Sequence, residues 1–222
     1  MRPLMLAFVA VVLLLAGPAV YAENRVDIGG SIVNGNLNNF YLAIGEHYRT
    51  PLQQVIVVRE RHIPDPEIPV VYFLARQARV APEVIVDLRL HGNSWMDITL
   101  RYGLSPEIYY VPVTRAPGPP FGHAYGHYKK KHRKEWKNLR LDDDDVIELV
   151  NVRFLSERYH RTPDEVVRLR TAGNDFYRIN DEMRGGERER DKKERKEEKK
   201  REKEYKKEHK HGDKHGHKHR DD

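Results

Sequence analysis

The sequence predicts an all-α fold of tandem helical hairpins, arranged as a helical repeat or a compact orthogonal bundle. The main observation is a duplication: residues 67–98 align without a gap on residues 148–179, and 11 of the 32 aligned positions are identical. Both copies also place a proline where a helix would begin and a glycine where it would end, as helix termini favour. A parallel sheet is the alternative, because VVYFLA and EVIVDLRL are β-prone strings. The shared proline and glycine favour helices.

The identical positions are typical of helix packing and helix ends, so we interpret the duplication as a way of building a hairpin and not as a catalytic motif. The identical pairs are Glu67/Glu148, Val71/Val152, Phe73/Phe154, Leu74/Leu155, Pro82/Pro163, Val86/Val167, Leu88/Leu169, Arg89/Arg170, Gly92/Gly173, Asn93/Asn174 and Ile98/Ile179.

The first 22 residues have the pattern of a secretory signal peptide. Arg2 supplies a positive start, residues 4–16 are uncharged and apolar, and Ala22 ends a stretch that a signal peptidase could cleave. The apolar run is too short for a membrane anchor, which needs about 20 residues. We therefore expect an exported protein, periplasmic or secreted, with no transmembrane span after cleavage.

Residues 23–110 are predicted to hold a lead and two hairpin units. The lead, 23–39, is rich in Gly and Asn and is expected to be flexible. In unit one, Thr50-Pro51 separates two helical segments. In unit two, helices are expected at 70–80 and 83–90, and Ser94 with Asp97 forms a capping box for a short third helix.

Residues 141–183 are predicted to form unit three, which repeats the plan of unit two around Thr162-Pro163 and Gly173. Units two and three are separated by residues 111–140, which contain four prolines within nine residues and then eight basic residues against one acid over the whole segment. This composition predicts an exposed, semi-rigid linker that can fold back on the body.

Residues 184–222 form a charged tail with 17 Lys/Arg and 12 Asp/Glu among 39 residues. Such a segment buries too little apolar surface to form a core, so it is expected to be disordered or a solvated helix. The tail carries most of the net charge of +6, since residues 23–183 hold 22 residues of each sign. A nucleic-acid partner is therefore not expected for the body.

The end of the tail, HKHGDKHGHKH, is the first candidate site. Neutral imidazoles at this spacing can bind Zn, Ni or Cu, although a solvated tail without a metal is the alternative. The candidate ligands are His209, His211, His215, His217 and His219. A second histidine set, His123, His127 and His132, is expected to lie in a loop, because Gly122 and Gly126 disfavour a helix.

A binding surface is the second candidate site. The run 129–134 is strongly basic and flanked by aromatic residues, which suits an anionic polymer or membrane headgroups. The residues assigned to this surface are Trp95, Tyr109, Tyr110, Lys129, Lys130, Lys131 and Trp136. Motifs for phosphate loops, metalloproteases or serine hydrolases do not occur, so no catalytic residue is assigned.

Residues 69–113 and 149–170, and most specifically the string GNSWMDI at 92–98, resemble a group of uncharacterised exported bacterial proteins with a duplicated hairpin. The resemblance implies export and an envelope setting, and no activity.

These observations predict an envelope protein that acts by binding or scaffolding through its helical body, with the tail as an interaction appendage. The expected partner is another envelope protein or an anionic polymer. One alternative is a metal-binding or metal-buffering protein that uses the tail. The other is an envelope hydrolase that uses carboxylates such as Asp87 and Asp97.

Overall fold

The computed structural model describes residues 35–115 and 117–212. Within these residues the regular secondary structure is helical and no strand occurs. The all-α prediction is therefore confirmed. The predicted signal peptide and all of the lead before residue 35 lie outside the described residues. Among the described residues, no helix combines the length and the apolar character that crossing a membrane requires.

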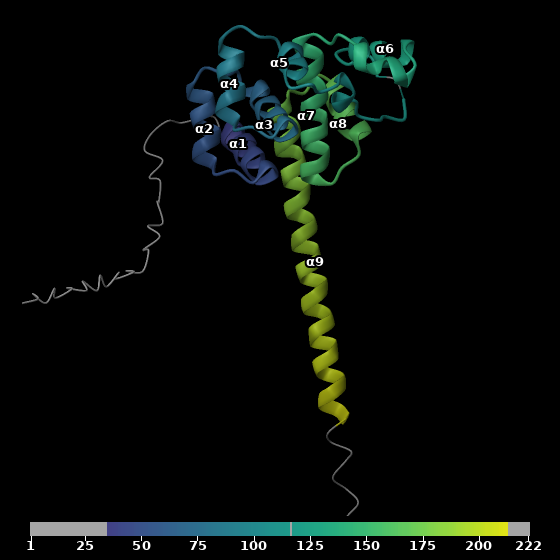
Figure 1. Cartoon of the computed structure of the whole chain (residues 1–222). Coiled ribbons are helices and arrows are strands. Elements are labelled where there is room, and N and C mark those ends of the chain that lie inside the picture. Colours follow the sequence, from purple (N-terminus) through teal and green to yellow (C-terminus); the bar gives the residue numbers. More distant parts are fainter. Residues whose placement is uncertain (1–34, 116, 213–222) are drawn as a thin grey trace, which may run out of the picture. The chain divides into compact units, whose positions relative to one another are not determined.

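The helices follow the predicted units (Figure 1). Unit one consists of α1 (Gly35–Tyr48) and α2 (Leu52–Glu60). Unit two consists of η1 (Asp65–Glu67), α3 (Ile68–Ala78), α4 (Pro82–Leu90) and α5 (Trp95–Arg101). Unit three consists of α7 (Asp143–Tyr159), α8 (Pro163–Thr171) and the first turns of α9 (Phe176–Gly212).

The duplicated sequence adopts the same local structure twice. The turn between the first two helices of each copy passes through a left-handed residue, Arg79 with φ 58° and His160 with φ 52°. Gly92 and Gly173 follow the second helix with φ 83° and 93°, a conformation that glycine adopts without steric cost. Ser94 caps α5 as predicted, because its hydroxyl accepts the amide N–H of Asp97 at 3.1 Å.

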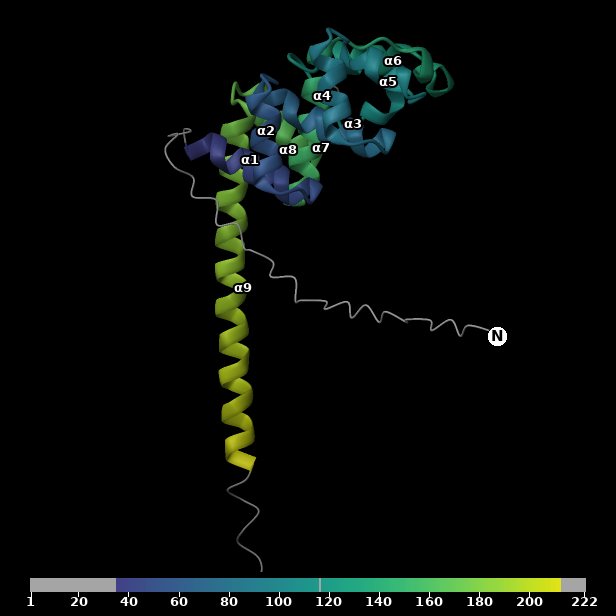
Figure 2. The same cartoon turned by 60° about the vertical axis from the view of Figure 1, so that its left-hand side comes forward.

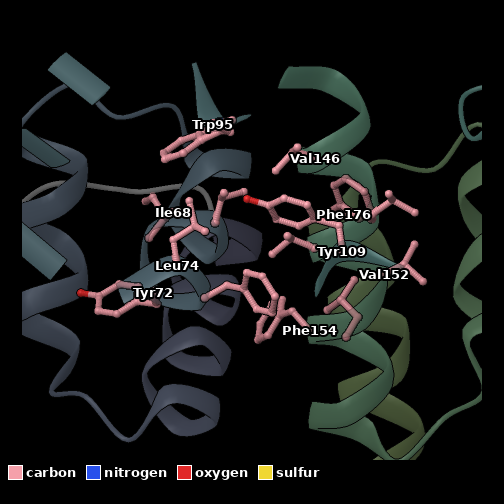
Figure 3. Packing of buried hydrophobic residues seen from close by; sticks show 14 of the residues in the cluster. Ile68, Tyr72, Leu74, Trp95, Tyr109, Val146, Val152, Phe154 and Phe176 are labelled. Carbon is pink, nitrogen blue, oxygen red and sulfur yellow. The ribbon is translucent and has the colours of Figure 1, made fainter. Parts of the chain in front are cut away.

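Helix α7 lies at the centre of the body. It packs against α1, α3, α5, α6, α8 and α9, and its buried residues lie on several faces of the helix. Such a helix is typical of a core position. Figure 3 shows Val146 and Phe154 of α7 facing Ile68 and Leu74 of α3. One continuous apolar cluster therefore joins the units.

Residues 111–140 fold back on the body, as the sequence allowed, but they are less exposed and more helical than the predicted linker. They contain α6 (Gly122–Lys130) and η3 (Arg133–Asn138), and η2 (Pro106–Tyr109) precedes them. Phe121, Ala124 and Leu139 are buried in the common core. Helix α6 packs on α7, and η3 packs on η2. The segment folds back on the body because its apolar residues gain more from burial than the glycines lose in helix propensity.

Helix α9 begins in the body and continues into the charged tail. Phe176, Ile179 and Met183 are buried, and this part packs on α1, α7 and α8. Figures 1 and 2 show the rest of α9 running clear of the other helices, and its side chains from 188 to 207 are exposed. The predicted tail therefore forms a helix up to residue 212, and its side chains are solvated from 188 to 207.

Candidate functional site

Four aromatic side chains from residues 110–136 surround a pocket of about 310 Å³, and we call this feature the aromatic pocket. Its lining residues are Tyr110, Val113, Tyr125, Tyr128, Lys129 and Trp136. Concave sites of this size with aromatic walls and few polar groups are typical of small-ligand binding.

Three short elements bring these residues together. Tyr125 and Tyr128 are three residues apart on α6, so they lie on one side of that helix. Trp136 lies in η3, and Tyr110 follows η2 directly, where an extended backbone (φ −62°, ψ 124°) ends the 3-10 helix. The contact between η2 and η3 closes the pocket.

The rings contact one another closely. The ring centroid of Tyr110 lies 4.5 Å from that of Trp136 and 5.0 Å from that of Tyr128. Tyr128 and Trp136 meet edge to face at 4.9 Å, an arrangement that adds to the stabilisation from burial alone.

Hydrogen bonds to backbone carbonyls fix three of the four rings. The hydroxyl of Tyr125 donates to the carbonyl of Val111 at 2.7 Å, and that of Tyr128 donates to the carbonyl of Pro106 at 2.8 Å. The indole N–H of Trp136 donates to the carbonyl of Tyr128 at 3.1 Å. Burial raises the pKa of Tyr125 and of Tyr128 far above the usual value, so both hydroxyls stay protonated donors. The walls of the pocket are therefore preorganised.

A positive charge cluster lies beside the pocket. Lys129, on the pocket wall, and the adjacent Lys130 and Lys131 are exposed, and none of the three has an ion-pair partner within the described residues. Arg133 is engaged, because it pairs with Glu107 at 2.9 Å and its guanidinium lies over the Trp136 ring. Unpaired lysines beside an aromatic pocket favour an anionic ligand.

The structure brings together only part of the predicted binding surface. Tyr110, Lys129 and Trp136 line one pocket, and Lys130 and Lys131 lie exposed next to it. Trp95 and Tyr109 were assigned wrongly to the surface, because both are fully buried in the core (Figure 3).

The burial of these two residues has a local cause. Trp95 is the first residue of α5, and the guanidinium of Arg89 covers its ring at 4.6 Å. The hydroxyl of Tyr109 is hydrogen-bonded to the hydroxyl of Thr99, itself fully buried.

Sequence reasoning missed Tyr125 and Tyr128 as site residues. Their spacing with Phe121 and Ala124 is the helical pattern that could have revealed them.

The predicted metal ligands of the tail fall into two groups. His209 and His211 belong to the last turns of α9, and His215, His217 and His219 lie outside the described residues. The second histidine set is not in a loop as expected. His123 and His127 lie four residues apart on α6, on the side opposite Tyr125 and Lys129, and their ring centroids are 4.6 Å apart.

The carboxylates of the hydrolase alternative have structural partners. Asp87 pairs with Arg61 at 2.8 Å, and Asp97 accepts from Ser94 in the capping box. Hydrogen bonds from Ser94 lower the pKa of Asp97.

A different set of acids lines a pocket of about 490 Å³, which we call the acidic pocket. Its lining residues are Asp142, Asp144, Asp145 and Glu148, together with Pro120, His123, Ile147 and Arg170.

Comparison with known proteins gives no relative for this fold: no protein-family model, no curated protein and no solved structure matches the chain.

Proposed function

We propose that this protein binds an anionic polysaccharide of the cell envelope, with the aromatic pocket as the site for one sugar ring. The carrying observation is the aromatic pocket itself, four mutually packed rings with Lys129 on the wall. The helical body acts as the scaffold that holds this site.

The chemistry of the pocket suits a sugar that carries an acid group. Aromatic faces bind the apolar C–H surface of a ring, and preorganised walls lose little entropy on binding. Lys129, Lys130 and Lys131 supply charge to the carboxylates or phosphates of successive residues of a polymer. Because these lysines are exposed, their attraction weakens as salt rises.

The wider setting of the proposal follows from the sequence. The predicted signal peptide would place the protein where envelope polysaccharides occur. The exposed part of α9 would serve as an appendage for further interactions, and the histidines of the tail remain candidate ligands for Zn, Ni or Cu. A nucleic acid would also meet aromatic and basic groups, but the balanced charge of residues 23–183 does not favour it.

Titration calorimetry with a polygalacturonate oligomer tests the proposal. Lys129→Glu and Tyr110→Ala are each expected to weaken binding by about tenfold or more, which corresponds to about 1.4 kcal/mol. The matched control is Lys199→Glu on the exposed part of α9, which should bind like the unchanged protein. Neutral dextran should not bind. Equal affinity of Lys129→Glu and unchanged protein, or tighter binding of oligothymidylate than of the uronate oligomer, would contradict the proposal.

A further inference from the structure

The side of α6 turned away from the aromatic pocket carries a cluster of metal-ligand groups. His123 and His127 of α6 and Asp145 of α7 each offer one ligand atom, and these atoms all lie within 4.8 Å of one another. We propose that His123, His127 and Asp145 bind a divalent transition-metal ion of the Zn²⁺ type. This site is separate from the histidines of the tail and independent of the proposed polysaccharide binding.

The three ligand atoms lie close enough together to share one ion. Histidines four residues apart on a helix present their rings to the same point. Bonds of about 2.0–2.2 Å place tetrahedral ligand atoms about 3.3–3.5 Å apart. The Nδ1 of His123 is 2.9 Å from an Oδ of Asp145, and the widest separation within the cluster is below 4.8 Å. Small side-chain rotations would therefore bring all three atoms to bonding distance.

His127 provides the second, independent observation. Its Nε2 is buried and has no hydrogen-bond partner among the described residues. A buried polar atom without a partner destabilises the folded state, and a buried nitrogen of this kind is expected to bind an ordered water or an ion. A metal ion shared with His123 and Asp145 would give this nitrogen a partner.

Asp145 is a strong ligand because of its surroundings. Its side chain is only 3% exposed, and burial raises its pKa, since a carboxylate is poorly solvated there. A bound cation compensates such a charge better than one hydrogen bond from a histidine that is 62% exposed.

Asp142 supports the site from the same helix end. One oxygen of its carboxylate accepts the amide of Asp145 at 2.7 Å, which fixes the first turn of α7. The other oxygen lies 3.5 Å from the Nδ1 of His123. Because this nitrogen is the one that would bind the ion, the Asp142 carboxylate adds negative charge beside the site.

The acidic pocket gives an ion a path to the cluster. His123, Asp142 and Asp145 line it, so two ligands and their neighbour face the open space. The four carboxylates of the pocket exceed the charge of Arg170, and this excess attracts cations. Two nitrogen ligands and one oxygen favour Zn²⁺, Co²⁺ or Ni²⁺ over Ca²⁺ or Mg²⁺, which prefer oxygen alone.

Zn²⁺ titration by calorimetry tests the site in the full chain with the five tail histidines replaced by glutamine. One equivalent is expected to bind, and His127→Gln should weaken it by at least about a hundredfold, as loss of a direct ligand exceeds the loss of a supporting group. The control His91→Gln, at the exposed end of α4, should bind as before. Zn²⁺ affinity that is equal in His127→Gln and His91→Gln would overturn the proposal.

A second measurement remains informative if a substitution disturbs folding. In the same tail-substituted chain without further changes, Zn²⁺ should shift the ¹⁵N resonances of the His123 and His127 rings and leave those of His91 in place. Shifts of equal size in all three rings, or none, would count against the site. Asp145→Asn should abolish the selective shift while circular dichroism shows the metal-free fold unchanged; a selective shift that persists in Asp145→Asn excludes the carboxylate as a ligand.

Discussion

The glutamate, arginine and asparagine shared by the two sequence copies form the same polar cluster twice. Arg89 pairs with Glu67 at 2.8 Å, and Arg170 pairs with Glu148 through the same nitrogen at 3.0 Å. In each copy the arginine also donates at 3.2 Å to the carbonyl of the asparagine that follows the glycine. The cluster joins the second helix of each hairpin, and the loop that follows it, to a glutamate near the start of the hairpin, Glu67 in η1 or Glu148 in α7.

The first copy has a contact that the second lacks. Asp143, at the start of α7, accepts from Arg89 at 2.5 Å and from the amide of Trp95 at 2.8 Å. It thereby fastens unit three to the start of α5, where a negative charge also suits the helix dipole. Arg170 has no such third partner among the described residues. The first cluster therefore stabilises the contact between units two and three as well as unit two itself.

Replacing Arg89 by methionine is expected to lower the free energy of unfolding by about 2–4 kcal/mol, because two partly buried carboxylates lose their partner. Side chains of Arg89 and Glu67 are 20% and 11% exposed. Arg61→Met is the matched control: its ion pair with Asp87 is 37% and 56% exposed, and such pairs contribute below about 1 kcal/mol. Urea denaturation followed by circular dichroism measures both. A smaller loss for Arg89→Met than for Arg61→Met would show that the cluster does not stabilise the fold.

The identity of these residues was visible in the sequence, but their role was not. Alignment of the copies shows that Glu67, Arg89 and Asn93 recur. It does not show that residues 22 apart meet, because that contact depends on how α3 and α4 cross. Asp143 could not be assigned at all, since its partner Arg89 is 54 residues away along the chain.

At the scale of single elements, the helices that carry proline, glycine and capping signals were predictable and α6 was not. Gly122 and Gly126 lower the propensity of α6, and this argued for a loop. A side chain at Gly126 would meet nothing within 4 Å, so the glycine is not required by packing. The helix forms because Phe121, Ala124, Tyr125 and Tyr128 are buried on one side. Tertiary burial therefore outweighs local propensity in this segment.

The predicted sites depend on the same element. Tyr110, Lys129 and Trp136 were assigned to a binding surface from composition alone, since basic and aromatic residues cluster there, and the structure places all three on one pocket. The grouping of His123 and His127 with Asp145 was not predictable, because it needs both the helical register of α6 and its contact with α7. Sites that involve two elements distant in sequence need the fold.

Helix α9 consists of a packed part and a solvated part, and these should unfold separately. Beyond the body the helix carries exposed ion pairs such as Lys192 with Glu189 and Lys206 with Glu202. Each such pair is exposed to solvent, so its contribution to helix stability is small and is weakened by salt. Isolated helices held in this way melt gradually.

Truncation after Arg190 is expected to change the free energy of unfolding of the body by less than about 1 kcal/mol, because the exposed helix makes few contacts with it. The ion pair between Arg158 and Glu187 stays within the shortened chain. The ellipticity at 222 nm that the truncation removes should fall gradually on heating and decrease in 1 M NaCl. A sharp, salt-independent transition in the difference between the two chains would instead indicate that the tail packs against a partner, such as a second copy.

At the scale of the whole molecule, the three units form one body because α7, which belongs to unit three, packs against helices of units one and two. A single apolar cluster runs from Phe40 in α1 to Met183 in α9. Arg153 of α7 donates to the carbonyl of Tyr110 at 2.7 Å, which fastens the start of the 111–140 segment to the core. Asp164 at the start of α8 accepts from the amide of Thr114 at 3.0 Å. The two proposed sites thus lie on a segment that is anchored at several points.

This anchoring predicts that the 111–140 segment unfolds together with the body. Two single-tryptophan variants separate the regions: Trp136→Phe leaves Trp95 as the reporter of unit two, and Trp95→Phe leaves Trp136 as the reporter of the segment. Within each variant, tryptophan fluorescence and circular dichroism at 222 nm should give the same urea midpoint and the same slope, because small domains with one core unfold in a single step. Comparing the probes within one variant removes any effect of the substitution on stability. An earlier fluorescence transition in the variant that retains Trp136 would mean that the segment detaches first, and the aromatic pocket and the metal site would then be features of an opening arm instead of a rigid body.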